Sequence, residues 1–262
     1  MSTRVRALTA LTRTLKPLDA YALGLGDDAL IASHRLTEWL TRAPDLEEEV
    51  ALANVALDQL GQARYLLGYA GRSSGLTEDE LAYQRTDREY RNCLLVELPN
   101  GDFAHTILRL LFFSAYQRQL YTALGESTDG ELAAFAKKAC VEVDYHYEYA
   151  ASWTLRLGDG TEESHDRAGA ALAELWPYTA ELFAGDELVA ALAAEGLVPD
   201  PERIQGPWME QVTAILAEAT LGTSPSGTWR PGGGRNGLHT EALSLLLAEM
   251  QSVHRAHPGA SW

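Results

Sequence analysis

Residues 103–125, FAHTILRLLFFSAYQRQLYTALG, carry the pattern that decides the fold. The run is long, mostly apolar and free of proline, and Asp102 stands where a residue would cap the start of a helix over 102–125. A second long helical pattern, 129–157, begins at a capping Asp129 and ends at the turn Gly158-Asp159-Gly160. Because the connection between the two is short, they are predicted to form an antiparallel hairpin.

Another pair of long helices precedes this hairpin. Residues 19–42 have apolar positions at helical intervals, and Pro44 ends the pattern. Asp45 and Glu48 then form a capping box for a helix over 45–70, DLEEEVALANVALDQLGQARYLLGYA. Again the connection is short, so a second hairpin is predicted.

A longer crossover joins the two hairpins. It holds a short helix from Thr77 to about residue 91, followed by the segment CLLVELPNG (93–101), which is predicted to be extended. Two hairpins joined by one long crossover is the connection scheme of ferritin-like bundles. The sequence therefore predicts an all-α protein with a ferritin-like four-helix bundle.

The rest of the chain adds helices rather than strands. Helical patterns follow near 162–176, 186–195, 202–221 and 239–256, and a glycine-rich loop occupies 222–238. We expect one ferritin-like helical domain over 19–262 with additional C-terminal helices. Residues 1–18 carry four basic and no acidic side chains and are predicted to be a basic N-terminal extension.

Composition excludes several classes of function. The 262 residues are 46% hydrophobic, which is typical of a globular protein, and the formal net charge is −16. Such acidity argues against binding to nucleic acid or to an anionic membrane. Two distant cysteines without metal spacing fit a reducing compartment, so we expect a cytoplasmic protein.

A di-iron centre in such bundles uses a Glu-x-x-His motif on each of two helices and a carboxylate on each of the other two. The stretch VEVDYHYEYA (141–150) is where one of these motifs would be expected. Glu142 is followed three residues later by Tyr145, and Asp58 is followed three residues later by Gly61. Residues 103–125 contain no Asp or Glu. We therefore expect a degenerate pseudo-site at Asp58, Gly61, Glu142 and Tyr145, with no catalytic residue, metal or cofactor in this chain.

Two alternatives remain open at this point. Asp58, Glu142 and His146 could form a reduced metal site, which would make the chain a metal-dependent monooxygenase subunit with non-standard ligands. The loop 228–237, with Arg230 and Arg235, could instead touch the phosphates of a coenzyme A ester, which would make it an acyl-CoA-binding helical module.

Five stretches carry a resemblance to a known family. They are YALGLGDDALIASHRLTEW, ALANVALDQLGQARYLLGYA, LLVELPNGDFAHTI, LWPYTAELF and GLHTEALSLLLAEMQ, spread over residues 19–262. In these stretches the chain resembles PaaC, the family of C subunits of the bacterial ring 1,2-phenylacetyl-CoA epoxidase.

The resemblance implies a structural role in aerobic phenylacetate degradation. In that family the ferritin-like A subunit holds the di-iron centre and the substrate, whereas the C subunit has lost the ligands and pairs with A. With further subunits, the complex epoxidises the aromatic ring of phenylacetyl-CoA using oxygen. The resemblance therefore implies that this chain is a non-catalytic subunit of a di-iron monooxygenase complex whose main partner is the A subunit.

Overall fold

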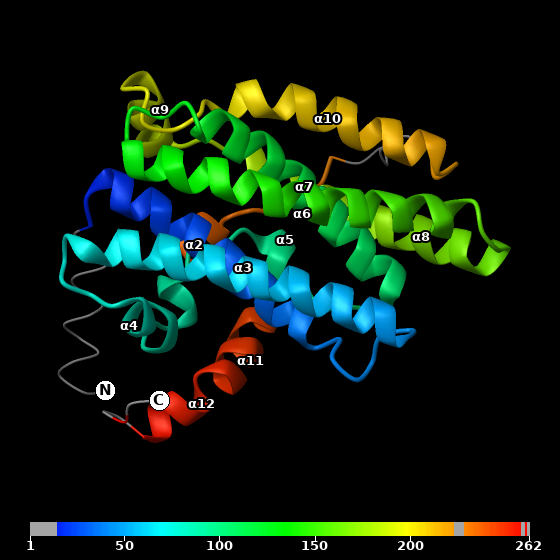
Figure 1. Ribbon diagram of the computed structural model, residues 1–262, viewed down its shortest axis with the longest axis horizontal. Helices are drawn as coiled ribbons and strands as arrows, with labels where there is room; N and C mark the ends of the chain where they lie inside the picture. The colour runs from blue at the N-terminus through cyan, green and yellow to red at the C-terminus, as the bar shows by residue number, and fades with distance from the viewer. Residues whose placement is uncertain (1–14, 223–227, 258–259, 261–262) are drawn as a thin grey trace. The chain divides into compact units, whose positions relative to one another are not determined.

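The protein is described by a computed structural model covering residues 15–222, 228–257 and 260. The described residues form α-helices and short 3-10 helices and contain no strand, which confirms the all-α prediction (Figure 1). Most of the predicted extension, residues 1–14, lies outside the described residues, and the first described helix begins at Pro17. Within the described ranges no helix is both long and apolar enough to cross a membrane.

Helical elements follow one another along the described residues. In chain order they are α2 (Pro17–Thr37), α3 (Leu46–Arg72), α4 (Glu78–Tyr83), η1 (Asp87–Glu89), α5 (Leu94–Glu97), α6 (Phe103–Leu124), α7 (Gly130–Gly158), α8 (Glu162–Leu175), η2 (Trp176–Phe183), α9 (Glu187–Ala194), α10 (Pro201–Glu218), η3 (Gly234–Asn236), α11 (Glu241–Met250) and α12 (Ser252–Ala256).

The predicted helix starts are confirmed by their capping contacts. Thr77 and Glu80 form a reciprocal capping box at α4, and the carboxylate of Asp102 accepts from the backbone N–H of His105 at 2.9 Å. Asp129 caps α7 in the same way. These side chains satisfy backbone N–H groups that have no partner inside the helix, which fixes where each helix begins.

Three predicted boundaries were wrong. The helix predicted over 19–42 ends at Thr37, because the chain turns there and Thr41 adopts a left-handed φ of 70°. The segment 93–101 is not extended throughout, since Leu94–Glu97 forms the helical turn α5. The helix predicted over 239–256 is interrupted at Gln251, whose buried side-chain amide donates to the carbonyl oxygens of Ala82 and Arg85.

Two further predicted helices are shorter than expected or continue differently. The helix expected from Thr77 to about residue 91 stops at Tyr83, and η1 follows it. The helix expected over 162–176 continues as the 3-10 turns of η2, in which Pro177 lacks the N–H needed for a regular helical bond.

The described chain divides into two compact units. Unit 1 comprises Met1–Thr37, Ala56–Pro99 and Gly232–Trp262, and unit 2 comprises Glu38–Val55 and Asn100–Pro231. Each unit therefore takes in segments that are far apart in the sequence. The prediction of a single domain over 19–262 stays a prediction.

Unit 2 is built around the α6–α7 hairpin, with α8 and α10 packed against it (Figure 1). Its core contains an aromatic cluster in which the ring of Trp208 lies 5.7 Å from Trp176 and 5.1 Å from Phe183. The indole N–H of the fully buried Trp208 donates to the carbonyl of Phe112 at 3.0 Å. A buried indole with a satisfied N–H fixes the position of α10 on α6.

Unit 1 joins the N-terminal helix to the end of the chain. Helix α2 packs against α5, and α11 packs against η1. Nearly every residue of α2 after Tyr21 is buried, including the charged side chains of Asp27 and Asp28. Buried charges need partners, and the partners of these two come from the crossover and from the C-terminal segment.

Two glycines of α7 test the packing of unit 2. A Cβ at Gly158 would lie 2.0 Å from the carbonyl oxygen of Ala219, whereas one at Gly130 would meet nothing within 4 Å. Because the backbone must move to admit the first methyl group, Gly158→Ala should lower the free energy of unfolding by about 1–3 kcal/mol.

The matched control is Gly130→Ala, which should leave stability unchanged or raise it by about 0.5–1 kcal/mol through the lower entropy of the unfolded chain. Urea denaturation followed by circular dichroism measures both. Equal stability of the two variants would contradict the close approach of the α7 and α10 ends.

Candidate functional site

The four residues of the predicted pseudo-site lie toward the outside of their helices. Gly61 is exposed, and Tyr145 exposes 49% of its surface. Asp58 and Glu142 are partly exposed. A ligand set for an enclosed metal centre would instead lie on the buried faces of α3 and α7.

The buried face of each helix carries a different pair of residues three apart. On α3 the pair is Gln59 and Gln62, and on α7 it is Val143 and His146. Each pair stands one residue later than the positions chosen from motif spacing. The interior positions of α3 are thus neutral amides, and α7 retains one imidazole.

Apart from His105 and Arg109 in its first half, the buried polar side chains of helix α6 are neutral. Ser114 donates to the carbonyl of Leu110 at 2.6 Å, and the amide of Gln117 donates to the Tyr121 hydroxyl at 3.3 Å. Both of these contacts lie within α6. The two side chains offer no negative charge to a cation.

The two aspartates of α2 are bound to arginines. The fully buried carboxylate of Asp27 accepts from both terminal nitrogens of Arg85, with Nη1 at 2.9 Å from Oδ2, and from the backbone N–H of Arg91 at 2.8 Å. The guanidinium carbon of Arg85 also lies 4.2 Å from the centre of the Tyr90 ring. Two hydrogen bonds between one guanidinium and one carboxylate give the strongest geometry available to an ion pair.

Asp28 is held in a similar way by the C-terminal segment. Nη2 of Arg235 donates to Oδ2 at 2.6 Å and Nη1 to Oδ1 at 3.0 Å, while the backbone N–H of Cys93 donates to Oδ1 at 2.7 Å. Nη1 of Arg235 also reaches the carbonyl oxygens of Gly24 and Arg91 at 2.9 and 2.8 Å. Arg235 is therefore committed to α2 and to the crossover.

Glu97 forms the third buried acid–base group of unit 1. Its carboxylate accepts from the Asn92 amide at 2.8 Å and from the Thr240 backbone N–H at 2.6 Å, and it lies 2.7 Å from Nδ1 of His239. The other ring nitrogen of His239 lies 3.0 Å from the carbonyl oxygen of Tyr90. Because both ring nitrogens face acceptors, both carry a proton and the imidazole is positively charged.

The pKa of His239 agrees with this geometry. Burial alone would lower the pKa, but the hydrogen bond and the negative charge of Glu97 outweigh burial and raise it above its ordinary value. His239 and Thr240 thus bind the start of α11 to α5.

A di-iron centre does not fit these buried side chains. Iron in such bundles is held by carboxylates and imidazoles from all four long helices. Here α3 offers two amides, α6 offers a hydroxyl, an amide and, near its start, the imidazole of His105, and the α2 aspartates are neutralised by arginines. In residues 15–222, 228–257 and 260, no group of three or more His, Cys, Asp or Glu residues could hold a metal ion.

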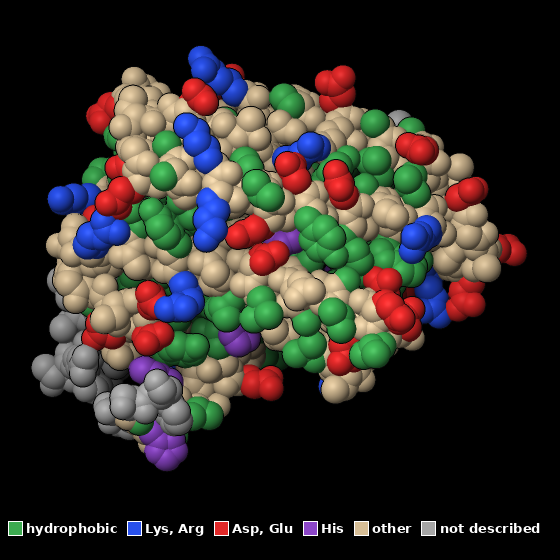
Figure 2. Space-filling model, viewed as in Figure 1, with side chains coloured by type: hydrophobic (Ala, Val, Ile, Leu, Met, Phe, Trp, Pro, Cys, Tyr) green, Lys and Arg blue, Asp and Glu red, His purple; other side chains and the backbone are tan. Residues whose placement is uncertain are grey.

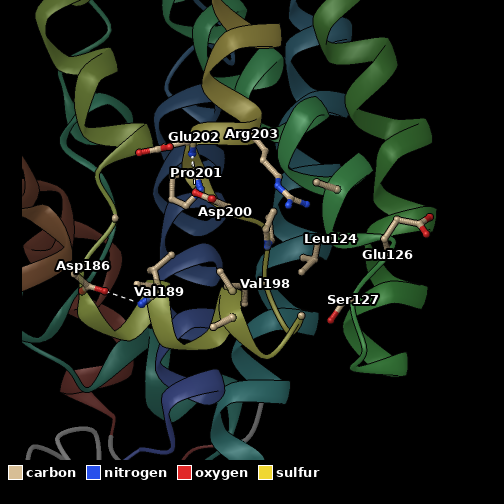
Figure 3. Close-up of a pocket in the computed structure, with 17 residues that line it drawn as sticks. Leu124, Glu126, Ser127, Asp186, Val189, Val198, Asp200, Pro201, Glu202 and Arg203 are labelled. Atoms are coloured by element: carbon tan, nitrogen blue, oxygen red, sulfur yellow. Dashed lines mark hydrogen bonds between the residues drawn. The ribbon is translucent and has the colours of Figure 1, made fainter.

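A cavity of about 680 Å³ lies in unit 2 beside α9 (Figure 3). Small apolar side chains of α9 line it together with the loop before α10. Its charged lining residues are one arginine and four acids, namely Arg203, Glu126, Asp186, Asp200 and Glu202. Two of the acids cap helices, since Asp186 accepts from the Val189 N–H and Asp200 from the Glu202 N–H. A lining with an excess of negative charge does not suit the phosphates of a coenzyme A ester.

The charged state of His239 predicts a pH dependence. A group whose pKa is raised by folding stabilises the protein fully below its unfolded pKa, and that contribution is lost as the pH rises through the folded pKa. Through this group, the free energy of unfolding should therefore be lower at a pH above the raised folded pKa than at about pH 6, which lies below the ordinary histidine pKa of about 6.5. His239→Asn should remove that part of the dependence and lower stability at about pH 6 by roughly 3–5 kcal/mol, because it leaves Glu97 buried without its cation.

Urea denaturation at the two pH values measures the change, with His257→Asn, at an exposed position, as the control. An unchanged pH dependence in His239→Asn, with the control behaving the same way, would contradict the charged assignment.

Comparisons with known proteins agree with the fold and the sequence resemblance. The family model described as "Phenylacetic acid catabolic protein" matches residues 1–262. The chain is 46% identical over 249 residues to the C subunit of the 1,2-phenylacetyl-CoA epoxidase of Escherichia coli (strain K12), covering 95% of this chain and 100% of that protein.

Among solved structures, the chain resembles a Synechococcus protein with aldehyde deformylating oxidase activity, with a TM-score of 0.58 and 19% identity over 78% of this chain and 90% of that one. At this identity the likeness shows the fold alone, and it confirms the predicted ferritin-like helical architecture. The family match and the identity to the Escherichia coli protein together show that the chain belongs to the phenylacetic acid catabolic protein family.

Proposed function

We propose that this chain is a non-catalytic structural subunit of a phenylacetyl-CoA 1,2-epoxidase complex, in which it pairs with the di-iron catalytic A subunit. The proposal takes its reaction from the name of the 46% identical relative. It takes its non-catalytic character from the buried polar side chains of this chain, and that observation carries it.

The ion pairs of the buried carboxylates support a role without iron. A fold that holds iron places several carboxylates in its interior, where they would repel one another without the cations. In this chain, Asp27 and Asp28 are compensated by Arg85 and Arg235 rather than by metal. The protein can therefore keep its interior charges balanced without a bound cation.

The proposal also includes a degenerate pseudo-site, in which the metal ligands of a di-iron centre are missing. Asp58, Gly61, Glu142 and Tyr145 remain the positions predicted from motif spacing. The residues that are buried, and that would therefore face an enclosed site, stand one position later in the sequence: Gln59 and Gln62 on α3, and Val143 and His146 on α7. In either register each helix lacks a complete Glu-x-x-His motif.

The alternative of an acyl-CoA-binding module has less support. Its two basic residues were Arg230 and Arg235, and the guanidinium of Arg235 is bound to Asp28 and to two carbonyl oxygens. Residues 223–227 of the predicted loop lie outside the described residues.

We further propose that the chain is cytoplasmic, in keeping with a catabolic complex that acts on a coenzyme A ester.

Association with the A subunit tests the pairing. When the tagged A subunit of the same organism is co-expressed with this chain, the two should elute together in size-exclusion chromatography after affinity purification. A tag-only column run with the same lysate is the control. Elution of the two chains as separate species at micromolar concentration would contradict the proposed pairing.

Iron content tests the non-catalytic part separately. The chain purified alone from iron-supplemented cells should contain far less than one iron per chain, whereas the A subunit prepared in parallel should contain iron. Glu142→Ala should leave the iron content of this chain unchanged, because that side chain has no complete ligand set around it. Two irons per chain, lost in Glu142→Ala, would make this chain the catalytic one.

A further inference from the structure

Helix α3 carries a second apolar stripe on its solvent side. Leu46, Val50, Ala53, Leu57 and Leu60 follow one another at intervals of four, three, four and three residues, as the numbers in the sequence show. Leu46, Val50 and Leu57 expose 70%, 53% and 64% of their surfaces. Alternating intervals of three and four are the spacing of a seam that packs against another helix. We call these five residues the α3 stripe.

The α3 stripe lies opposite the face that α3 contributes to the core. At about 100° per residue, its members cluster roughly half a turn from the buried residues Leu52, Val55 and Leu66. Hydrophobic side chains reach the surface along the region of Figure 2 in which Figure 1 places α3. A helix that is apolar on both faces has one face still without a partner, and such exposed patches mark interaction sites.

The flanks of the α3 stripe are acidic. Glu47 and Asp58 stand on one side and Glu49 on the other. The arginine at the far end of the stripe, Arg64, donates to the carboxylate of Glu78 at 2.9 Å, so its charge is already balanced. An apolar seam between acidic borders complements a seam whose borders carry Lys or Arg.

This charge pattern selects among possible occupants. A second copy would bring the same acidic borders and a net charge of −16, so self-association through the stripe is disfavoured. An anionic membrane is disfavoured for the same reason. Charge therefore points to a different protein with an apolar helical seam between basic borders.

We propose that the α3 stripe is the surface that receives a helix of the catalytic A subunit, a helix with aliphatic residues between basic borders. This inference rests on the proposed pairing and specifies its surface. Gly61 lies beside the stripe, and a Cβ there would meet nothing within 4 Å, so the partner helix can approach the α3 backbone closely at that point.

The test compares two double variants with equal added charge. Val50→Lys with Leu57→Lys changes the stripe at exposed positions, so the fold should be preserved. Leu245→Lys with Val253→Lys changes two exposed aliphatic residues of α11 and α12, which expose 67% and 57% of their surfaces. Binding to the purified, immobilised A subunit is measured by biolayer interferometry, and circular dichroism checks the fold of every variant.

The stripe variant should raise the dissociation constant by about tenfold or more, because charges would be buried at the centre of the interface. The control should change it by less than about twofold. Glu47→Lys should slow association and reduce the dependence of its rate on salt, as expected where acidic borders attract a basic partner.

The possible binding results distinguish the surface assignment from the pairing with the A subunit. If the wild-type chain binds the A subunit and the stripe variant binds equally well, the surface assignment is wrong and the pairing stands. If the wild-type chain does not bind, the pairing itself fails and the surface assignment fails with it. A wild-type homodimer that the stripe variant dissolves would make a second copy the occupant and overturn the proposal.

Discussion

The structure of unit 1 depends on neutralising two adjacent carboxylates inside a helix bundle. Asp27 and Asp28 follow one another on α2, and their exposure is almost zero. Removing an ionised carboxylate from water costs several kcal/mol, and two neighbouring charges add repulsion. The chain meets this cost with two guanidinium groups from different segments, Arg85 in the crossover and Arg235 near the C-terminus. The crossover and the C-terminal segment are therefore held on α2 by electrostatics as well as by apolar packing.

The same arrangement shows how a ferritin-like bundle can balance interior carboxylates with guanidinium groups. In a metal-binding bundle, cations compensate interior carboxylates and the carboxylates in turn tie helices together. Here guanidinium groups supply the charge, and a backbone amide also donates to one oxygen of each carboxylate. The remaining interior polar positions, such as Gln59, Gln62 and Ser114, are neutral and cost less to bury once hydrogen-bonded.

Much of the fold follows from the sequence, because helix starts and long apolar periods are local signals. Asp102, Asp129 and the Thr77–Glu80 pair mark helix starts that the structure confirms. The ends were harder to predict, since they depend on distant contacts. Gln251 breaks the last helix by bonding to carbonyls about 170 residues earlier in the chain, and no local pattern near residue 251 reveals this.

The candidate site shows why motif spacing alone is a weak guide. Asp58 and Gly61 were chosen because they stand three apart, whereas the apolar period through Leu52, Val55 and Leu66 places Gln59 and Gln62 on the buried face. That signal was present in the sequence. The pairing of Glu97 with His239 was not, because 142 residues separate them and only the folded chain brings them together.

The spread of unit 1 along the chain has a consequence for biosynthesis. During translation, α2 emerges early, yet the guanidinium that neutralises Asp28 lies 207 residues later. Unit 2, which ends at Pro231, is complete before that arginine leaves the ribosome. In the nascent chain, Asp28 therefore lacks its arginine partner until synthesis is almost finished, whereas Arg85 is available to Asp27 much earlier, so the Asp28–Arg235 pair is a late contact of unit 1.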